Sequence, residues 1–320
     1  MMFAIIVAVF VTIYRSEPTR VFKEGVLFVP AGLLLLISSV KWFVPILALL
    51  LLSIPPELRL ARLSRAIQMM FGCAVFMSLF VIAKATLIFA SPFRFDAAFE
   101  HLDRITHFGI RPLELAQSLS PYINPGVVSF FYMSLWSMPS FFFPLIIMLI
   151  EPEPGRRRRF ILLYFFVFVG LGLIFALLGM SAGPVYHDQL VAQARFADMP
   201  AFQQQSGLDT TGVAALQSLL WNLYSHDIEA ASGISAFPSV HVAMAMVFGL
   251  YLWERSRWLR PIAVAIPLWY QFLSVYTGWH YAVDGYFAII AVWAFWYLLR
   301  RSDHRNRSPT AAVDPSGEAA

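Results

Sequence analysis

Two histidines and one aspartate in the C-terminal part of the chain have the residue types that phosphoryl transfer requires. His241 ends a Pro-Ser-Val-His tetrad, and Asp284 follows His280 at a spacing that places both on one face of a helix. An imidazole can attack phosphorus, a carboxylate can orient it, and a second imidazole can protonate the leaving oxygen. The pattern predicts a phosphoester-cleaving or phosphate-transferring site, with catalytic residues His280, His241 and Asp284.

Other residues near these three are candidates for binding the substrate phosphate. Ser239 lies just before a predicted helix, where it can cap the helix and, with backbone N–H groups, hold an anion. Gly183 and Tyr186 belong to a Gly-Pro-Val-Tyr element that follows an apolar segment, and Tyr276 ends the apolar segment before His280. We expect all four to line the site.

Lys84 stands alone within a long apolar segment. An ionisable side chain at such a depth costs a few kcal/mol and marks a candidate functional site. It can supply a cation for the phosphate, or it can extend along the helix toward the headgroups. The sequence leaves both interpretations open.

The elements that position these residues must lie in a membrane. Of 320 residues, 59% are hydrophobic and only 13% are charged, with a mean hydropathy of +0.68. A soluble fold of this size could not bury so much apolar surface. The single cysteine, Cys73, excludes an intrachain disulfide and a cysteine metal cluster. We expect an integral membrane protein that binds no nucleic acid.

Apolar segments predict an all-α, polytopic transmembrane helical bundle of about eight or nine spans. Eight spans result if the two short segments at 26–40 and 42–54 form one broken helix. The predicted spans cover residues 2–15, 26–40, 42–54, 69–91, 126–150, 160–181, 238–254, 260–276 and 281–299.

Arginine-rich linkers predict the orientation of this bundle. Four basic segments, at 57–65, 151–159, 255–260 and after residue 299, fall on one side if every span crosses once. The positive-inside rule places them in the cytoplasm. The histidine segments then face the extracytoplasmic side, and the C-terminus is cytoplasmic. We expect this arrangement in a bacterial inner (plasma) membrane.

From these predicted spans and linkers, we expect the chain to divide into three parts. Residues 1–68 form N-terminal spans and a cytoplasmic linker, 69–301 a phosphatase- or phosphotransferase-like membrane domain, and 302–320 a disordered cytoplasmic tail. The outer loop at 92–125 is amphipathic and predicts short interfacial helices. Within it we interpret three charged residues as interfacial salt-bridging groups: Asp96, Asp103 and Arg104. We expect His187 to lie on the surface.

The motifs resemble those of the type 2 phosphatidic acid phosphatase superfamily, whose signatures are K-x6-R-P, P-S-G-H and S-R-x5-H-x3-D. Residues 238–241 match the second with valine for glycine, and His280 with Asp284 matches the end of the third. No K-x6-R-P precedes the 182–237 loop, and Ser274 replaces the arginine of the third motif. The resemblance implies a phosphohistidine intermediate and a lipid phosphate or phospho-head-group as substrate.

One branch of that superfamily, resembling fungal inositolphosphoceramide synthase, also lacks those cations. Its Gly-Pro-x-Tyr, S-x-x-P-S-x-H and T-x-x-H-Y-x-x-D elements are similar to segments beginning at Gly183, Ser235 and Thr277. This resemblance implies a phosphotransferase in sphingolipid metabolism that hands the group to a lipid or polyol hydroxyl. Water as acceptor would make the protein a lipid phosphate phosphatase.

Members of the family need no metal, so we expect no metal and no cofactor. Three other classes compete with this interpretation: an intramembrane protease using Ser239, a metal-dependent hydrolase with the histidines and Asp284 as ligands, and a transporter or scaffold without catalysis. The sequence gives no indication of protein partners.

Overall fold

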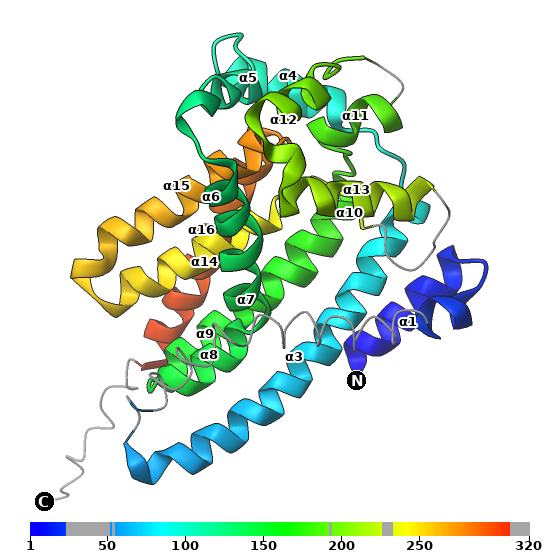
Figure 1. The fold of residues 1–320 in the computed structure, drawn as a ribbon. Coiled ribbons are helices and arrows are strands. Elements are labelled where there is room, and N and C mark those ends of the chain that lie inside the picture. The colour runs from blue at the N-terminus through cyan, green and yellow to red at the C-terminus, as the bar shows by residue number, and fades with distance from the viewer. Residues whose placement is uncertain (24–51, 53–54, 192–193, 226–232, 308–320) are drawn as a thin grey trace, which may run out of the picture.

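The computed structural model describes residues 1–23, 52, 55–191, 194–225 and 233–307. Every regular element in that part of the chain is helical, which confirms the predicted all-α class (Figure 1). The predicted spans at 26–40 and 42–54 lie, apart from Leu52, outside the described residues.

Three helical segments are long and apolar enough to cross a bilayer. They are α3 (Pro56–Ala90), the continuous run of α9 (Pro154–Phe165), η3 (Phe166–Phe175) and α10 (Ala176–Leu178), and α16 (Ala282–Arg307). The apolar α1 (Met2–Tyr14) is shorter and packs against α3.

A fourth span is broken near its middle. It begins with α6 (Pro125–Ser129), η2 (Phe130–Leu135) and α7 (Trp136–Phe141), and continues as α8 (Phe143–Ile150) after a bend of 59°. Pro144 has no backbone N–H to donate to the preceding turn and its ring crowds that turn, so it starts a new helix at the bend.

Two further helices form a hairpin packed on α16. These are α14 (Val240–Arg255) and α15 (Arg260–Tyr276), of 16 and 17 residues. At a rise of about 1.5 Å per residue each extends roughly 25 Å, somewhat less than a hydrocarbon core of about 30 Å. The described residues thus hold three spans, or four with the bent pair, and the expected eight or nine are not confirmed.

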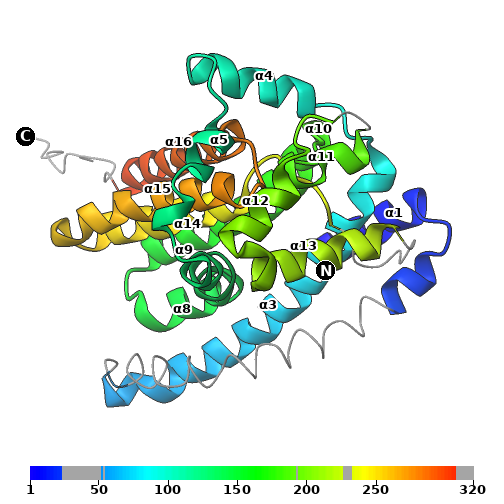
Figure 2. The ribbon, with the colours of Figure 1, turned by 45° about the horizontal axis from the view of Figure 1, so that its top comes forward.

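Short helices gather into a cap at one end of this bundle, uppermost in Figure 1 and brought forward in Figure 2. The predicted interfacial helices of the 92–125 loop are present as α4 (Asp96–Thr106), α5 (Pro112–Gln117) and η1 (Ser120–Tyr122). The rest of the cap comprises α11 (Pro184–Leu190), α12 (Met199–Ser206), η4 (Leu208–Thr210) and α13 (Gly212–Ser225).

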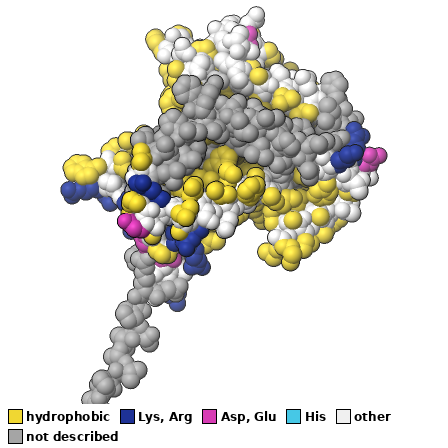
Figure 3. Space-filling view, turned by 60° about the horizontal axis from the view of Figure 1, so that its bottom comes forward, with side chains coloured by type: hydrophobic (Ala, Val, Ile, Leu, Met, Phe, Trp, Pro, Cys, Tyr) yellow, Lys and Arg dark blue, Asp and Glu magenta, His cyan; other side chains and the backbone are white. Residues whose placement is uncertain are grey.

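Aromatic side chains fill the core between the spans. Tyr132, Tyr164, Phe168 and Tyr276 are among the largest side chains that are fully buried. Hydrophobic side chains also cover much of the outer surface in Figure 3, as expected where a protein faces lipid.

The last helix extends further than the sequence suggested. We expected a disordered tail from residue 302, but α16 runs to Arg307. Asp303 forms an ion pair with the buried Arg159 of α9, which ties this end of the helix to the bundle.

Candidate active site

The two histidines, 39 positions apart in sequence, lie side by side beneath the cap. His241 is in the first turn of α14, and His280 is in the turn between α15 and α16. Their ring centroids are 6.3 Å apart. The hairpin therefore brings both imidazoles to one end of the bundle.

Asp284 lies beside His280 in the first turn of α16. Its Oδ2 is 3.5 Å from Nδ1 of His280 and accepts a hydrogen bond of 3.0 Å from the backbone N–H of Tyr281. The carboxyl group is fully buried. At this distance the carboxylate makes no hydrogen bond to the imidazole, but it lies close enough to stabilise a positive charge on it.

Two aromatic rings of the bent span hold His241. Its imidazole lies between Tyr132, at a centroid distance of 4.1 Å, and Trp136, at 4.0 Å. The indole N–H of Trp136 also donates to the backbone carbonyl of His241, at 3.0 Å. Sequence reasoning missed both aromatics, although their spacing of four places them on one helix face.

Ser239 caps α14, as predicted. Its Oγ accepts a hydrogen bond of 3.3 Å from the N–H of Val242. The hydroxyl also lies 3.5 Å from that of Ser274, which lies 3.4 Å from the hydroxyl of Tyr132. Ser239 and Ser274 are both buried. This chain of hydroxyls links the start of α14 to the ring that stacks on His241.

The Gly-Pro-Val-Tyr element packs directly against the turn that carries His280. Gly183 has a φ of +79°, and a side chain there would meet the backbone oxygen of Trp279 at 2.4 Å, so only glycine fits. The hydroxyl of Tyr186 donates to the backbone carbonyl of Gln217. The buried Tyr276 packs its ring against Phe202.

The carboxylates of α4 differ from the interfacial salt-bridging groups we expected. Asp96 accepts hydrogen bonds from the N–H groups of Ala182 and Gly183 and from the hydroxyl of Tyr281, each at 3.0 Å. Asp96 is 1% exposed. It therefore joins the glycine turn to the residue after His280.

Asp103 is the second such carboxylate. It is 5% exposed and accepts hydrogen bonds from the N–H groups of Ala282, at 2.8 Å, and Val283, at 2.9 Å. The three residues between His280 and Asp284 are thus all bound by α4. The sequence cannot show that a carboxylate binds backbone N–H groups. The spacing of Asp96, Glu100 and Asp103, however, places three carboxylates on one helix face, which could have indicated a shared role.

Burial raises the pKa of Asp103 to about 6, and the nearby Asp284 carboxylate contributes to the increase. The hydrogen bonds from Ala282 and Val283 act in the opposite direction, because they stabilise the charged form. Asp103 therefore titrates closer to neutral pH than an ordinary aspartate.

A family model described as the PAP2 superfamily matches residues 97–298, which is more than half of the chain. The chain belongs to the PAP2 superfamily. No curated protein and no solved structure matches it. The superfamily we predicted is therefore confirmed, and the protein is of the phosphatase type that cleaves phosphoesters. The match includes both histidines and Asp284.

Ser274 stands at the position that the S-R-x5-H-x3-D signature gives to an arginine. Ser274 is 1% exposed, and in the described part of the chain its hydroxyl contacts those of Tyr132 and Ser239. The described hydrogen bonds and ion pairs place no arginine side chain on either histidine or on Asp284. The described part of the chain also contains no group of three or more His, Cys, Asp or Glu residues that could hold a metal ion.

Lys84 lies in α3, outside the matched range. Its ammonium donates a hydrogen bond of 3.2 Å to the backbone carbonyl of Gly172 in η3. The stem of Lys84 packs against Gly233. The side chain therefore points into the bundle.

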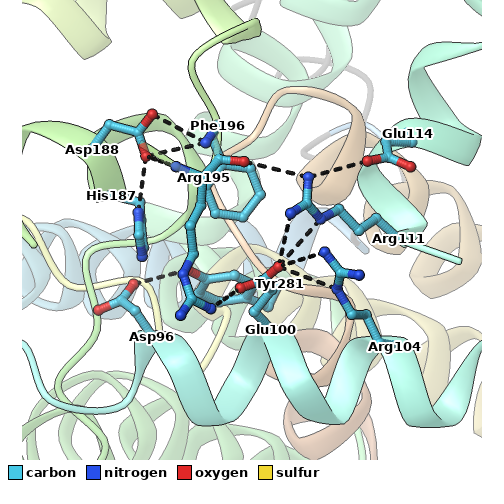
Figure 4. Close-up of polar contacts among 10 residues, drawn as sticks. All are labelled: Asp96, Glu100, Arg104, Arg111, Glu114, His187, Asp188, Arg195, Phe196 and Tyr281. Carbon is cyan, nitrogen blue, oxygen red and sulfur yellow. Dashed lines mark hydrogen bonds and ion pairs between the residues drawn. The ribbon is translucent and has the colours of Figure 1, made fainter. Parts of the chain in front are cut away.

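Arginines surround the third carboxylate of α4, as Figure 4 shows. Glu100 pairs with Arg104 and Arg111, each at 3.1 Å, and with Arg195. Burial opposes ionisation of Glu100, but the hydrogen bonds from Arg195 and Arg104 outweigh it, so its pKa is lowered. This network fastens the loop after α11 to α4.

His187 lies in α11, just before the same loop. We expected it on the surface, but it is 1% exposed, and its Nδ1 lies 2.9 Å from Asp188. Asp188 also accepts hydrogen bonds from the N–H groups of Arg195 and Phe196. His187 thus belongs to the packing of the cap.

Proposed function

We propose that the protein cleaves a lipid phosphate or phospho-head-group through a phosphohistidine on His280. The observation that carries this proposal is the convergence of His241, His280 and Asp284 at one end of the bundle, with ring centroids 6.3 Å apart.

The reaction has two displacement steps. A nitrogen of His280 attacks phosphorus, and the bond from phosphorus to the leaving oxygen breaks as that oxygen takes a proton from His241. His241, now neutral, then removes a proton from the acceptor hydroxyl. The acceptor oxygen attacks phosphorus, the N–P bond breaks, and His280 is regenerated. Asp284 stabilises the charge on His280 throughout.

The acceptor decides the reaction class. With a lipid or polyol hydroxyl the protein is a phosphotransferase, as the similarity to inositolphosphoceramide synthase implies, and it acts in sphingolipid metabolism. With water it is a lipid phosphate phosphatase. The elements around Gly183, Ser235 and Thr277 favour transfer.

We propose that Lys84 supplies the cation that the family's arginine and lysine provide elsewhere. Its direction into the bundle supports this role. Ser239, Gly183, Tyr186 and Tyr276 complete the substrate side of the site. Three of these groups already have hydrogen-bond partners within the protein: the N–H of Gly183 and the hydroxyls of Ser239 and Tyr186. We therefore propose that these residues shape the phosphate site and do not bind the phosphate through those groups.

The site faces the extracytoplasmic side in this proposal. The arginine-rich segments 151–159 and 255–260 lie at the far ends of α9 and α14 from the cap, which supports a cytoplasmic location for them. A lipid substrate would then reach the histidines from the outer leaflet.

Trapping the phosphoenzyme tests this function. Purified protein is incubated with a ³²P-labelled lipid phosphate, with and without a chelator, and quenched in alkali, where phosphohistidine is stable. We expect labelled protein in both conditions, and none with His280→Ala. The exposed His101→Ala is the matched control and should label normally.

Two results would contradict the proposal. Labelling that needs an added divalent ion would favour the metal-dependent hydrolase. Neither labelling nor phosphate release with any lipid phosphate or phospho-head-group lipid, from folded protein, would favour a transporter or scaffold.

A further inference from the structure

A charged cavity lies at the end of the bundle away from the histidines. Its volume is about 260 Å³. Glu254, thirteen positions after His241 on α14, lines it, so the two sites are roughly 20 Å apart along that helix. The lining residues are Glu153, Arg156, Arg159, Trp253, Glu254, Arg260, Arg300 and Asp303.

Two of the four lining arginines are fully engaged in ion pairs. Arg156 pairs with Glu151 at 3.1 Å, Glu153 at 3.0 Å and Glu254 at 3.2 Å. Arg159 pairs with Glu254, at 2.7 Å, and with Asp303. These bonds join α9, α14 and α16, and they use the carboxylates that line the cavity.

The other two arginines stand at the exposed rim and stack on indoles. The guanidinium of Arg260 lies 4.8 Å from the ring centroid of Trp253, and that of Arg300 lies 5.2 Å from that of Trp296. Neither forms an ion pair with a carboxylate in the described part of the chain. The cavity therefore presents two guanidiniums whose N–H donors are available to a ligand.

The rim of the cavity favours an anion. Within the described residues, Arg156 and Arg159 engage the lining carboxylates and Glu151, whereas Arg260 and Arg300 have no carboxylate partner. Arg260 is also the first residue of α15, a 17-residue helix whose N-terminal N–H groups add partial positive charge. A planar guanidinium stacked on tryptophan is preorganised to bind phosphate oxygens in pairs.

We propose that this cavity binds a phosphate anion, with Arg260 and Arg300 as its ligands. In a membrane the abundant source is the headgroup of an acidic phospholipid, and basic pockets between spans at the cytoplasmic surface are suited to it. Trp253, 38% exposed, lies beside the rim, where an indole suits the headgroup region. Free phosphate or a soluble phosphoester offers the same chemistry.

Lipid retention tests the site independently of catalysis. Wild-type protein and the double variant Arg260→Gln/Arg300→Gln are purified from nanodiscs of phosphatidylcholine with phosphatidylglycerol, and bound lipid is counted by native mass spectrometry. We expect the wild type to retain phosphatidylglycerol preferentially. Loss of two charged ligands should weaken that retention by about tenfold or more. The double variant Arg260→Lys/Arg300→Lys should retain part of it.

Arg257→Gln is the matched control. Arg257 stacks on Trp258 at 4.9 Å on the same surface but does not line the cavity. Equal loss with Arg257→Gln would show a diffuse surface charge effect and overturn the site.

A second arm separates the two sources of phosphate. Inorganic phosphate is titrated into detergent-solubilised protein, and the thermal midpoint is followed. A rise in midpoint that requires Arg260 and Arg300, without selective lipid retention, identifies a soluble phosphate ligand at the proposed site. If neither phosphatidylglycerol nor inorganic phosphate binding depends on these two arginines, the proposal is wrong.

Discussion

Chemistry and positioning are divided among different residues. His241 and His280 carry the nitrogen atoms that could react, while their neighbours fix where those nitrogens point. Tyr132 and Trp136 clamp the ring of His241, and Asp284 lies 3.5 Å from His280. The three reactive residue types were predictable from motif spacing. The aromatic clamp could not be predicted, because two aromatic residues in an apolar segment normally pack in the hydrophobic core.

Asp284→Asn tests the orienting carboxylate. Asparagine is nearly isosteric but neutral, so it cannot stabilise a positive imidazole and can favour the wrong tautomer. We expect turnover to fall by about two to four orders of magnitude with little change in the thermal midpoint. Turnover on a lipid phosphate should be measured with the midpoint as control; unchanged turnover would exclude this role.

His241→Ala tests the general acid through the leaving group. A natural alkoxide needs a proton as it departs, whereas an activated aryl oxide does not. We expect a loss of about 10²–10⁴-fold on the natural substrate and partial recovery with an aryl phosphate. His280→Ala should recover nothing. Equal loss of His241→Ala activity on both substrates would assign His241 another role.

Lys84→Met tests whether the Lys84 ammonium is the cation that binds the substrate phosphate. Methionine keeps the length of the stem and removes the charge that would attract phosphate. We expect a higher KM or a lower kcat, amounting to about tenfold or more in kcat/KM, and partial recovery with Lys84→Arg. Wild-type kinetics in Lys84→Met would leave the lysine with a packing role only.

At the scale of elements, hydropathy predicted some helices closely and others not. The segment predicted at 260–276 is α15, and that at 238–254 differs from α14 by one or two residues. The span predicted at 69–91 begins earlier, at Pro56, so the segment predicted as a linker at 57–65 is helical. The 59° break within 126–150 was missed, because hydropathy is continuous across it and only two prolines, Pro139 and Pro144, mark it. The role of α4 was missed because its carboxylates bind backbone N–H groups, which every residue carries.

Asp103 should give the protein a pH-dependent stability. Its pKa of about 6 lies above that of an ordinary aspartate, near 4, so the folded state binds the proton more tightly. This contribution is fully present below about pH 4 and is lost as the pH rises through about 6. We expect the thermal midpoint of the wild type to fall over that window, and Asp103→Asn to reduce the fall.

Two variants of Asp103 distinguish the effect of its titration from the effect of its hydrogen bonds to the first N–H groups of α16. Asp103→Ala leaves the N–H groups of Ala282 and Val283 without their acceptor, and should cost about 1–3 kcal/mol at any pH. Asp103→Asn retains one acceptor oxygen and should cost less. A midpoint that has the same pH dependence in the wild type and Asp103→Asn would show that Asp103 does not titrate in this range.

The whole molecule is polarised from end to end. The cap and the two histidines beneath it are at one end, and four arginines line the cavity at the other. The spans between them are apolar. This separation fits a membrane protein whose two ends have different functions. Because the ends are distinct, labelling of single residues can test the orientation of the protein in the membrane.

Cysteine accessibility decides which end faces outward. The single native cysteine, Cys73, is buried, and Cys73→Ser provides a background without thiols. Ser218 on the cap and Ser302 near the end of α16 are both exposed, so each can carry one new cysteine. The positive-inside rule predicts that Ser218→Cys reacts with an impermeant maleimide in intact cells and that Ser302→Cys reacts only after permeabilisation. Labelling of Ser302→Cys alone in intact cells would place the histidines in the cytoplasm and reverse the proposed access of the lipid.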